Sequence, residues 1–354
     1  MTSVNLPKIM AIVLLTVLPF VIVAATALTG NGFLSFCAVA ALPEGVIGYI
    51  NEYDNGNLIQ DTLYNNYQLP SDSGIGSSAV NAQDSVTVSV EEAVMGYIIK
   101  KTLSPYSAKY KYNNIYLSNS TGAEINVAEE LSKPLDFKVV KSNEPQVLIY
   151  HTHTTESYMQ SEEEYYTTTD EPRTTDETKN MVAVGEVVRQ RLESAGFSVI
   201  HDKTIHDYPG FSGSYSRSAE TVKANLAKYP SIKVVIDIHR DSISGGNNDK
   251  VAPVVNINGK EAAQVMLVMG SETGTITNHP DWRHNLRLAL KLQYLFESTY
   301  PKFARTMLLR STKYNQNLSQ GAFLIEIGSD ANTMEQALYS AELVGDTLCR
   351  LLQT

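Results

Sequence analysis

The chain has 354 residues, of which 43% are hydrophobic and 19% are charged. This composition excludes a fully disordered chain and leaves enough apolar material for a buried core. Acidic residues outnumber basic residues, 38 to 28, and the formal net charge is −10. Proteins that bind nucleic acids usually show the opposite bias, so we exclude that class. With two cysteines, the chain is also not a disulfide scaffold.

The strongest local feature is an apolar run over residues 9–28, which contains no charged residue. As a helix it would span about 30 Å, the thickness of the hydrocarbon core of a bilayer. Lys8 precedes the run and favours a cytoplasmic N-terminus, so the pattern predicts a single-pass membrane protein whose remaining chain is extracytoplasmic. A cleaved signal peptide is the alternative, because Ala25-Thr26-Ala27 fits a cleavage site. The length of the run favours the uncleaved anchor.

The composition divides the chain into four regions in sequence order. Residues 1–28 are the cytoplasmic tip and transmembrane anchor, and residues 29–111 are an extracytoplasmic spacer. The spacer contains a Ser/Gly-rich stretch at residues 70–84, which is typical of a flexible linker. It also contains a possible strand at 86–90 and a possible short helix at 91–101. A small membrane-proximal β segment at residues 112–144 and a catalytic domain at residues 145–354 follow.

Strands and helices are predicted to alternate in the last of these regions. Continuous apolar runs predict buried strands at residues 147–150, 197–200, 232–238, 264–270 and 322–327. Helical spacing predicts helices at residues 176–195, 218–229, 282–299 and 333–352. This alternation predicts a three-layer α/β/α domain with a mostly parallel sheet. Ligands of such sheets bind beyond the C-terminal ends of the strands, so the functional residues are expected there.

Three of the predicted strands end in unusual polar residues. The first runs into His153 and Glu156, the third ends at His239, and the fifth contains Glu326. An imidazole or a carboxylate at the end of a buried strand is costly unless it has a partner. Each of these residues alone is more often structural, but their combination at one edge of a sheet indicates a shared metal ion. Imidazole and carboxylate ligands favour zinc, which keeps one position open for water in catalytic sites.

We therefore predict that His153, Glu156 and His239 bind Zn²⁺ and that Glu326 is the general base. His151 is the alternative to His153, although it lacks a carboxylate three residues further on.

Three further residues are weaker candidates for a role in the site. Arg240 and Asp241 follow His239 and could orient it or neutralise an oxyanion. Glu177 is the alternative carboxylate ligand, but a negative charge at the start of a helix is also a common structural feature.

The chain resembles the stage II sporulation protein P family of endospore-forming bacteria over roughly residues 112–354. The resemblance rests on three motifs, at residues 149–157, 235–242 and 324–328. More distantly, the domain looks like the zinc-dependent N-acetylmuramoyl-L-alanine amidases. That likeness implies zinc-binding roles for His153 and His239 and a catalytic role for Glu326. In those amidases the carboxylate ligand usually lies near the start of the first helix, which keeps Glu177 as the rival of Glu156.

The resemblance implies a peptidoglycan hydrolase. Such an enzyme would cleave the amide between N-acetylmuramic acid and the first L-alanine of the stem peptide, and the resemblance also implies cleavage of peptide cross-links. It would act at the septal or engulfing membrane during endospore formation, with SpoIID-type and SpoIIM-type proteins as partners. Two alternatives remain from the residues themselves: a zinc carboxypeptidase-like cell-wall peptidase, and a non-catalytic wall-binding scaffold.

Overall fold

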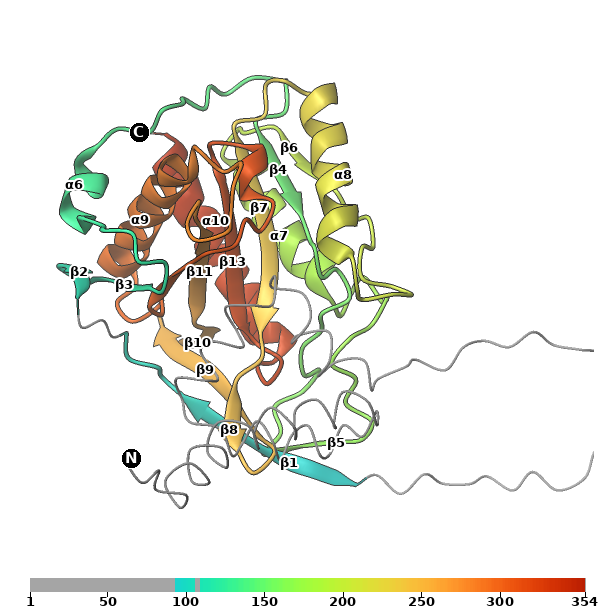
Figure 1. Ribbon diagram of the computed structural model, residues 1–354. Coiled ribbons are helices and arrows are strands. Elements are labelled where there is room, and N and C mark those ends of the chain that lie inside the picture. Colours follow the sequence, from blue (N-terminus) through green and yellow to red (C-terminus); the bar gives the residue numbers. More distant parts are fainter. Residues whose placement is uncertain (1–92, 106–108, 354) are drawn as a thin grey trace, which may run out of the picture. The chain divides into compact units, whose positions relative to one another are not determined.

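The structure, a computed structural model, describes residues 93–105 and 109–353 (Figure 1). These residues belong to one compact unit. The anchor predicted at residues 9–28 and the linker predicted at 70–84 lie outside the described residues and stay predictions. Within the described part of the chain, no helix has the length and apolar character needed to cross a bilayer.

The body of the protein is an eight-stranded sheet with the strand order β2-β3-β12-β11-β13-β7-β4-β6. Its strands are β2 (Tyr110–Tyr112), β3 (Ile115–Asn119), β4 (Val147–Tyr150), β6 (Val199–His201), β7 (Val234–Asp241), β11 (Val265–Gly270), β12 (Met307–Arg310) and β13 (Ala322–Ser329). Neighbouring strands are antiparallel at β2–β3 and β11–β13 and parallel elsewhere. The strands predicted from continuous apolar runs are therefore confirmed as members of one mostly parallel sheet.

Helices cover both faces of this sheet (Figure 1). On one face, α7 (Met181–Ser194), α9 (Trp282–Thr299) and α10 (Met334–Leu352) share a core with Ile149 of β4. On the other face, α8 (Ser214–Lys228) packs through Val222 against Leu148 of the same strand. Because successive strand residues point to opposite faces, adjacent apolar residues of β4 contribute to separate cores. The mixed α/β architecture predicted from the sequence is confirmed.

The ends of the helices follow from capping side chains. Asn180 accepts a hydrogen bond from the backbone N–H of Val182, which starts α7 later than the predicted residue 176. α10 begins with a reciprocal capping box between Thr333 and Gln336. A single 3₁₀ turn, η1 (Gln316–Leu318), precedes β13 among the described elements.

A second sheet lies outside the predicted α/β pattern, with the order β10-β9-β1-β5 and β8 paired to β9. Its strands are β1 (Val94–Lys101), β5 (Tyr165–Thr167), β8 (Ser244–Gly246), β9 (Asp249–Ile257) and β10 (Lys260–Ala263). The helix predicted over residues 91–101 is wrong, because residues 94–101 form β1. Ile98 packs against Ala252 and Val254, and β1 pairs with β9 about 150 residues later in the chain. Long-range pairing therefore overrides the weak local preference for a helix.

Residues 109–144 are part of the main body rather than a separate layer. β3 pairs with β12, and Ile115 and Leu117 are fully buried in the main core. The short helix α6 (Val127–Ser132) places Glu130 3.2 Å from the Arg287 guanidinium of α9. The sheet thus extends to the N-terminal side of residue 145, where the sequence suggested that the catalytic domain begins.

Truncation of Leu117 tests whether this segment belongs to the main body. We expect Leu117→Ala to lower the free energy of unfolding by about 2–5 kcal/mol, because it leaves a cavity in a packed core. Val140→Ala is the matched control, since Val140 is 68% exposed and should change stability by no more than about 0.5 kcal/mol. Denaturant titration of both variants measures the difference, and equal stabilities would contradict the assignment.

His279, in the turn before α9, gives the protein sensitivity to acid. Burial lowers the pKa of this imidazole to about 4, compared with about 6.5 when unfolded. The folded state therefore favours the neutral ring, and its contribution to stability is complete above pH 6.5 and is lost as the pH falls toward 4. Between pH 7 and pH 5, we expect the free energy of unfolding of His279→Gln to fall by about 1–2 kcal/mol less than that of the wild type. Identical pH dependence in denaturant titrations of variant and wild type would refute this.

Candidate active site

The loop that follows β4 carries the first two predicted ligands. The backbone N–H of Glu156 donates to the carbonyl of His153 over 3.2 Å, so a single turn brings the two residues together. Both side chains are almost fully buried. The loop is therefore packed inside the protein rather than extended into solvent, and its polar groups require partners there.

His239 of β7 meets this loop from the neighbouring strand. The ring centroids of His153 and His239 are 5.2 Å apart, and the rings are perpendicular. His239 Nδ1 lies 3.7 Å from Glu156 Oε2. The structure thus brings the three predicted ligands together at the C-terminal end of the parallel strands, where α/β sheets bind their ligands.

Glu326 of β13 is in register with His239, as its direct neighbour in the parallel pair β13–β7. Its Oε2 atom is buried and makes no hydrogen bond. Burial raises the pKa of Glu326 to about 8, and the nearby charges of His239 and Asp241 modify that shift in opposite directions. A buried carboxyl with an unused oxygen and a pKa near neutrality can both take up and return a proton at physiological pH.

The two rival ligands, His151 and Glu177, have other partners in the structure. His151 is fully buried, with Nδ1 3.0 Å from the carbonyl of Ile238 and Nε2 2.9 Å from Nε2 of His201. Both ring nitrogens of His151 are therefore occupied by structural contacts. Glu177 lies at the surface, where its side chain is 54% exposed and approaches Lys203 at 3.9 Å.

Arg240 and Asp241 influence the site through contacts with its residues and through charge. The backbone N–H of Arg240 donates to Glu156 Oε2 over 3.1 Å, and its Nε donates to the carbonyl of Ser157. Arg240 therefore holds the ligand loop against β7. Asp241 forms an ion pair with Arg305 at 2.8 Å and raises the pKa of Glu326 through its charge.

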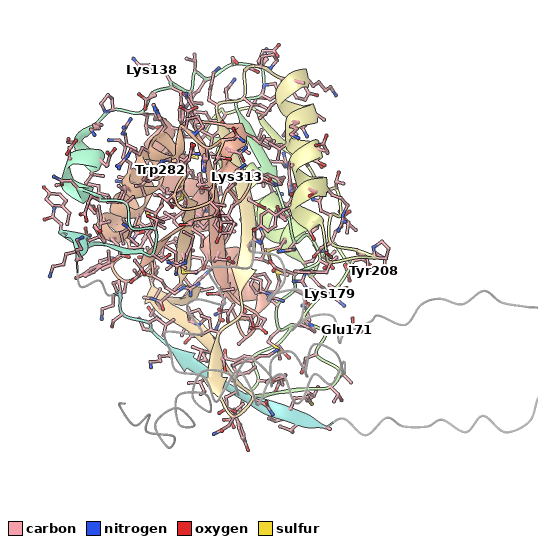
Figure 2. The ribbon with its side chains drawn as sticks, viewed as in Figure 1. Lys138, Glu171, Lys179, Tyr208, Trp282 and Lys313 are labelled. Carbon is pink, nitrogen blue, oxygen red and sulfur yellow. The ribbon has the colours of Figure 1, made fainter. Side chains whose placement is uncertain are left out.

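The sequence analysis missed several residues that surround the two histidines. Phe211 stacks on His153 with a centroid distance of 4.5 Å, and Tyr215 stacks on His239 at 6.5 Å. Asp207, which is buried, accepts a hydrogen bond from Arg173. These residues lie in the loop after β6, at the start of α8 and between β5 and α7, where no apolar run marks them. Tyr208, which follows Asp207 in the chain, points away from the body of the protein (Figure 2) and is 45% exposed.

The two imidazoles have opposite electrostatic environments. Burial alone would lower the pKa of His239, but the adjacent Asp237 carboxylate, with Glu156 and Glu326, raises it to about 10. Burial and the positive charges of His239 and Arg173 hold the pKa of His153 well below its usual value. One ring is thus stabilised as a cation and the other as a neutral base, so the site is strongly polarised.

The donor set has the chemistry that zinc prefers. Two imidazoles and a carboxylate lie in one buried cluster, and imidazole nitrogens and carboxylate oxygens are common zinc ligands. The unpartnered Glu326 Oε2 beside them is a costly group that a bound cation would compensate. Across the described residues, however, no three His, Cys, Asp or Glu side chains are already arranged around a common point that would hold an ion.

The molecule is thus a mixed α/β protein with a buried His–Glu cluster at the C-terminal end of its sheet. A family model for stage II sporulation protein P (SpoIIP) matches residues 74–349, and the chain belongs to this family. A curated relative, stage II sporulation protein P of Bacillus subtilis (strain 168), is 29% identical over 216 residues, which cover 58% of this chain and 50% of the relative. The chain therefore spans about half the length of the curated relative that it matches.

Solved structures with some likeness are amidases. N-acetylmuramoyl-L-alanine amidase AmiC2 of Nostoc punctiforme has a TM-score of 0.35 at 12% identity, covering 59% of this chain and 95% of that one. The amidase Ami1 of Mycobacterium smegmatis has a TM-score of 0.34 at 14% identity, covering 60% and 99%. The CwlD amidase of Clostridioides difficile, solved with the GerS lipoprotein, has a TM-score of 0.32 at 13% identity, covering 58% and 94%.

The different surroundings of His151 and His153 predict different effects of truncation. We expect His151→Ala to lower the free energy of unfolding of the metal-free protein by about 2–4 kcal/mol, because it leaves buried partners unsatisfied. His153→Ala removes ring contacts with Phe211, Tyr215 and His239, so a loss of about 1 kcal/mol is expected. Thermal and denaturant unfolding measure both, and equal losses would contradict the structural role of His151.

Proposed function

We propose that the chain is a zinc-dependent peptidoglycan hydrolase that cleaves the amide between N-acetylmuramic acid and L-alanine of the stem peptide. The observation that carries this proposal is the convergence of His153, Glu156 and His239 beside the buried carboxyl of Glu326. Membership of the stage II sporulation protein P family supports a cell-wall substrate in spore formation. Cleavage of peptide cross-links is a second activity that the same site chemistry would allow.

In this proposal His153, His239 and Glu156 hold the metal ion. When bound, zinc polarises the scissile carbonyl and makes its water more acidic. The backbone N–H of Arg240 fixes one oxygen of Glu156, and the Arg173 guanidinium approaches the other at 3.5 Å. These contacts restrict the carboxylate to one orientation, which is what a ligand in a preorganised site requires.

Glu326 transfers a proton from the attacking water to the leaving amine. Its unpartnered Oε2 accepts a proton from the attacking water as the new C–O bond forms, and later returns it to the leaving amine as the C–N bond breaks. Burial of this carboxyl maintains its raised pKa. The charge of the neighbouring metal centre would shift that pKa downward, toward the ionised form that a general base needs.

Aromatic side chains form one wall of the site. Tyr215 lies between His239 and Tyr314, with centroid distances of 6.5 Å and 6.1 Å, and Phe211 covers His153. All three aromatic rings are only partly buried. Flat apolar rings bind the apolar faces of sugars, so we assign the glycan of the substrate to this side of the site.

We also propose that residues 9–28 anchor the protein in the membrane with the catalytic domain extracytoplasmic. The absence of charge over this run supports the anchor. Partners of the SpoIID and SpoIIM type would place the enzyme at the septal membrane. The net charge of −10 gives no general attraction to anionic wall polymers, which makes capture by the site or by a partner necessary.

Glu326→Gln tests the mechanism. We expect the variant to fold and to bind zinc but to release stem peptides from purified peptidoglycan about 10²–10⁴-fold more slowly, because the base is lost. Glu177→Gln is the matched control and should retain full activity. Mass spectrometry of the released muropeptides measures the rate and distinguishes a free lactyl group, left by an amidase, from the new peptide ends left by a peptidase.

Removal of metal completes the test. A chelator should abolish peptide release by the wild type, and added Zn²⁺ should restore it. Full activity of Glu326→Gln would exclude the proposed base. No hydrolysis by the zinc-loaded wild type would favour a wall-binding scaffold instead.

A further inference from the structure

Two buried aspartates stand behind the two histidines of the cluster. Asp207 Oδ2 lies 4.0 Å from His153 Nδ1, and Asp237 Oδ1 lies 2.9 Å from His239 Nε2. The aspartate side chains are 0% and 1% exposed. Each histidine therefore faces a carboxylate that solvent cannot reach.

Both carboxylates are held in place by several donors. Asp237 accepts hydrogen bonds from the backbone N–H of Thr152 at 2.8 Å and from its hydroxyl at 2.7 Å. Asp207 accepts from the backbone N–H of Thr155 at 3.1 Å, from its hydroxyl at 2.7 Å, and from Arg173 at 2.6 Å. The threonine donors come from the same loop that carries His153 and Glu156. The positions of the carboxylates are thus fixed together with that of the loop.

The ring nitrogens divide into two kinds. His153 Nδ1 and His239 Nε2, which face the aspartates, are fully buried and make no aligned hydrogen bond. On the other side of the ring, His239 Nδ1 faces Glu156 at 3.7 Å. A buried nitrogen lone pair and a carboxylate repel each other, whereas an N–H and a carboxylate attract. A histidine that binds a metal ion is neutral, so in the metal-bound site the proton of each ring belongs on the nitrogen that faces the aspartate.

We propose that Asp207 and Asp237 are positioning residues that select the metal-binding nitrogen of each histidine. They hold the proton on His153 Nδ1 and on His239 Nε2, which leaves the lone pairs of His153 Nε2 and His239 Nδ1 for the metal. The two histidines would thus use different nitrogens. This inference rests on the zinc site of the proposed function, and it adds two residues that act through the ligands rather than on the substrate.

Zinc affinity of the full chain, purified in detergent, is the first test. A competition titration of Zn²⁺ against a chelating dye should show about 10–100-fold weaker binding for Asp207→Asn and for Asp237→Asn, which is the usual effect of losing a carboxylate behind a ligating histidine. Asp202→Asn is the matched control, because Asp202 is held by Asn225 and Thr204 and is expected to leave the affinity unchanged.

The second test needs no substitution and remains decisive if Asp237→Asn fails to fold. Nitrogen NMR of the zinc-loaded wild type, labelled with ¹⁵N in histidine, identifies the protonated nitrogen of each ring. We expect the N–H on Nδ1 of His153 and on Nε2 of His239. The reverse assignment on either ring would overturn the proposal for that residue.

The outcomes separate this inference from the proposed function. Unchanged zinc affinity in both Asn variants overturns the positioning role and leaves the hydrolase proposal standing. A loss as large as that of Glu156→Gln would make the aspartate a ligand itself, which also overturns the positioning role. A wild type that binds no Zn²⁺ would remove the metal from the proposed function, and this inference with it.

Discussion

The parallel pairing of β13 with β7 is the constraint on which the candidate site depends. It places Glu326 directly beside His239, within strands whose other residues are almost all buried. A shift of the register by one residue would turn both side chains to the opposite face of the sheet. The apolar residues that fix the register, such as Ile238 and Ile325, therefore also fix the geometry of the polar pair. Packing and chemistry are determined by the same strands.

Burying these polar side chains costs free energy, and a network of hydrogen bonds reduces that cost. Thr152 and Thr155 of the loop after β4 donate to Asp237 and Asp207, and the Arg240 guanidinium binds the carbonyl of Ser157. Every one of these contacts joins the loop to a neighbouring element. Because a buried polar group without a partner costs about 1–3 kcal/mol, the loop has few alternative conformations. The unpartnered oxygen of Glu326 is an exception in this network, and it is the atom to which we assign the proton transfer.

The charge around the site differs from that of the whole protein. The chain is acidic, yet Arg173, Arg240 and Arg217 lie close enough to His153 to lower its pKa. The local field on this side of the cluster is positive, while Asp237, Glu156 and Glu326 make the surroundings of His239 negative. Net charge therefore says little about the environment that a substrate meets, because a charge in a buried site is weakly screened and acts mainly on its nearest neighbours.

The sequence alone determined the central strands, the long helices and the edge of the sheet at which His153, Glu156, His239 and Glu326 meet. Continuous apolar runs and helical periodicity are local signals, and strands of a parallel sheet end at one edge whatever their order. Asn258-Gly259 is another local signal: both residues have left-handed conformations and form the two-residue turn between β9 and β10.

Only the tertiary structure decided the rest. It showed that residues 94–101 are a strand, that β3 extends the main sheet, and that His151 has structural partners on both ring nitrogens. It also brought Asp207 and Tyr215 to the histidines. These facts depend on contacts between residues distant in the chain. A single sequence contains no local pattern for them, because pairing energy and burial arise only when the separate segments meet.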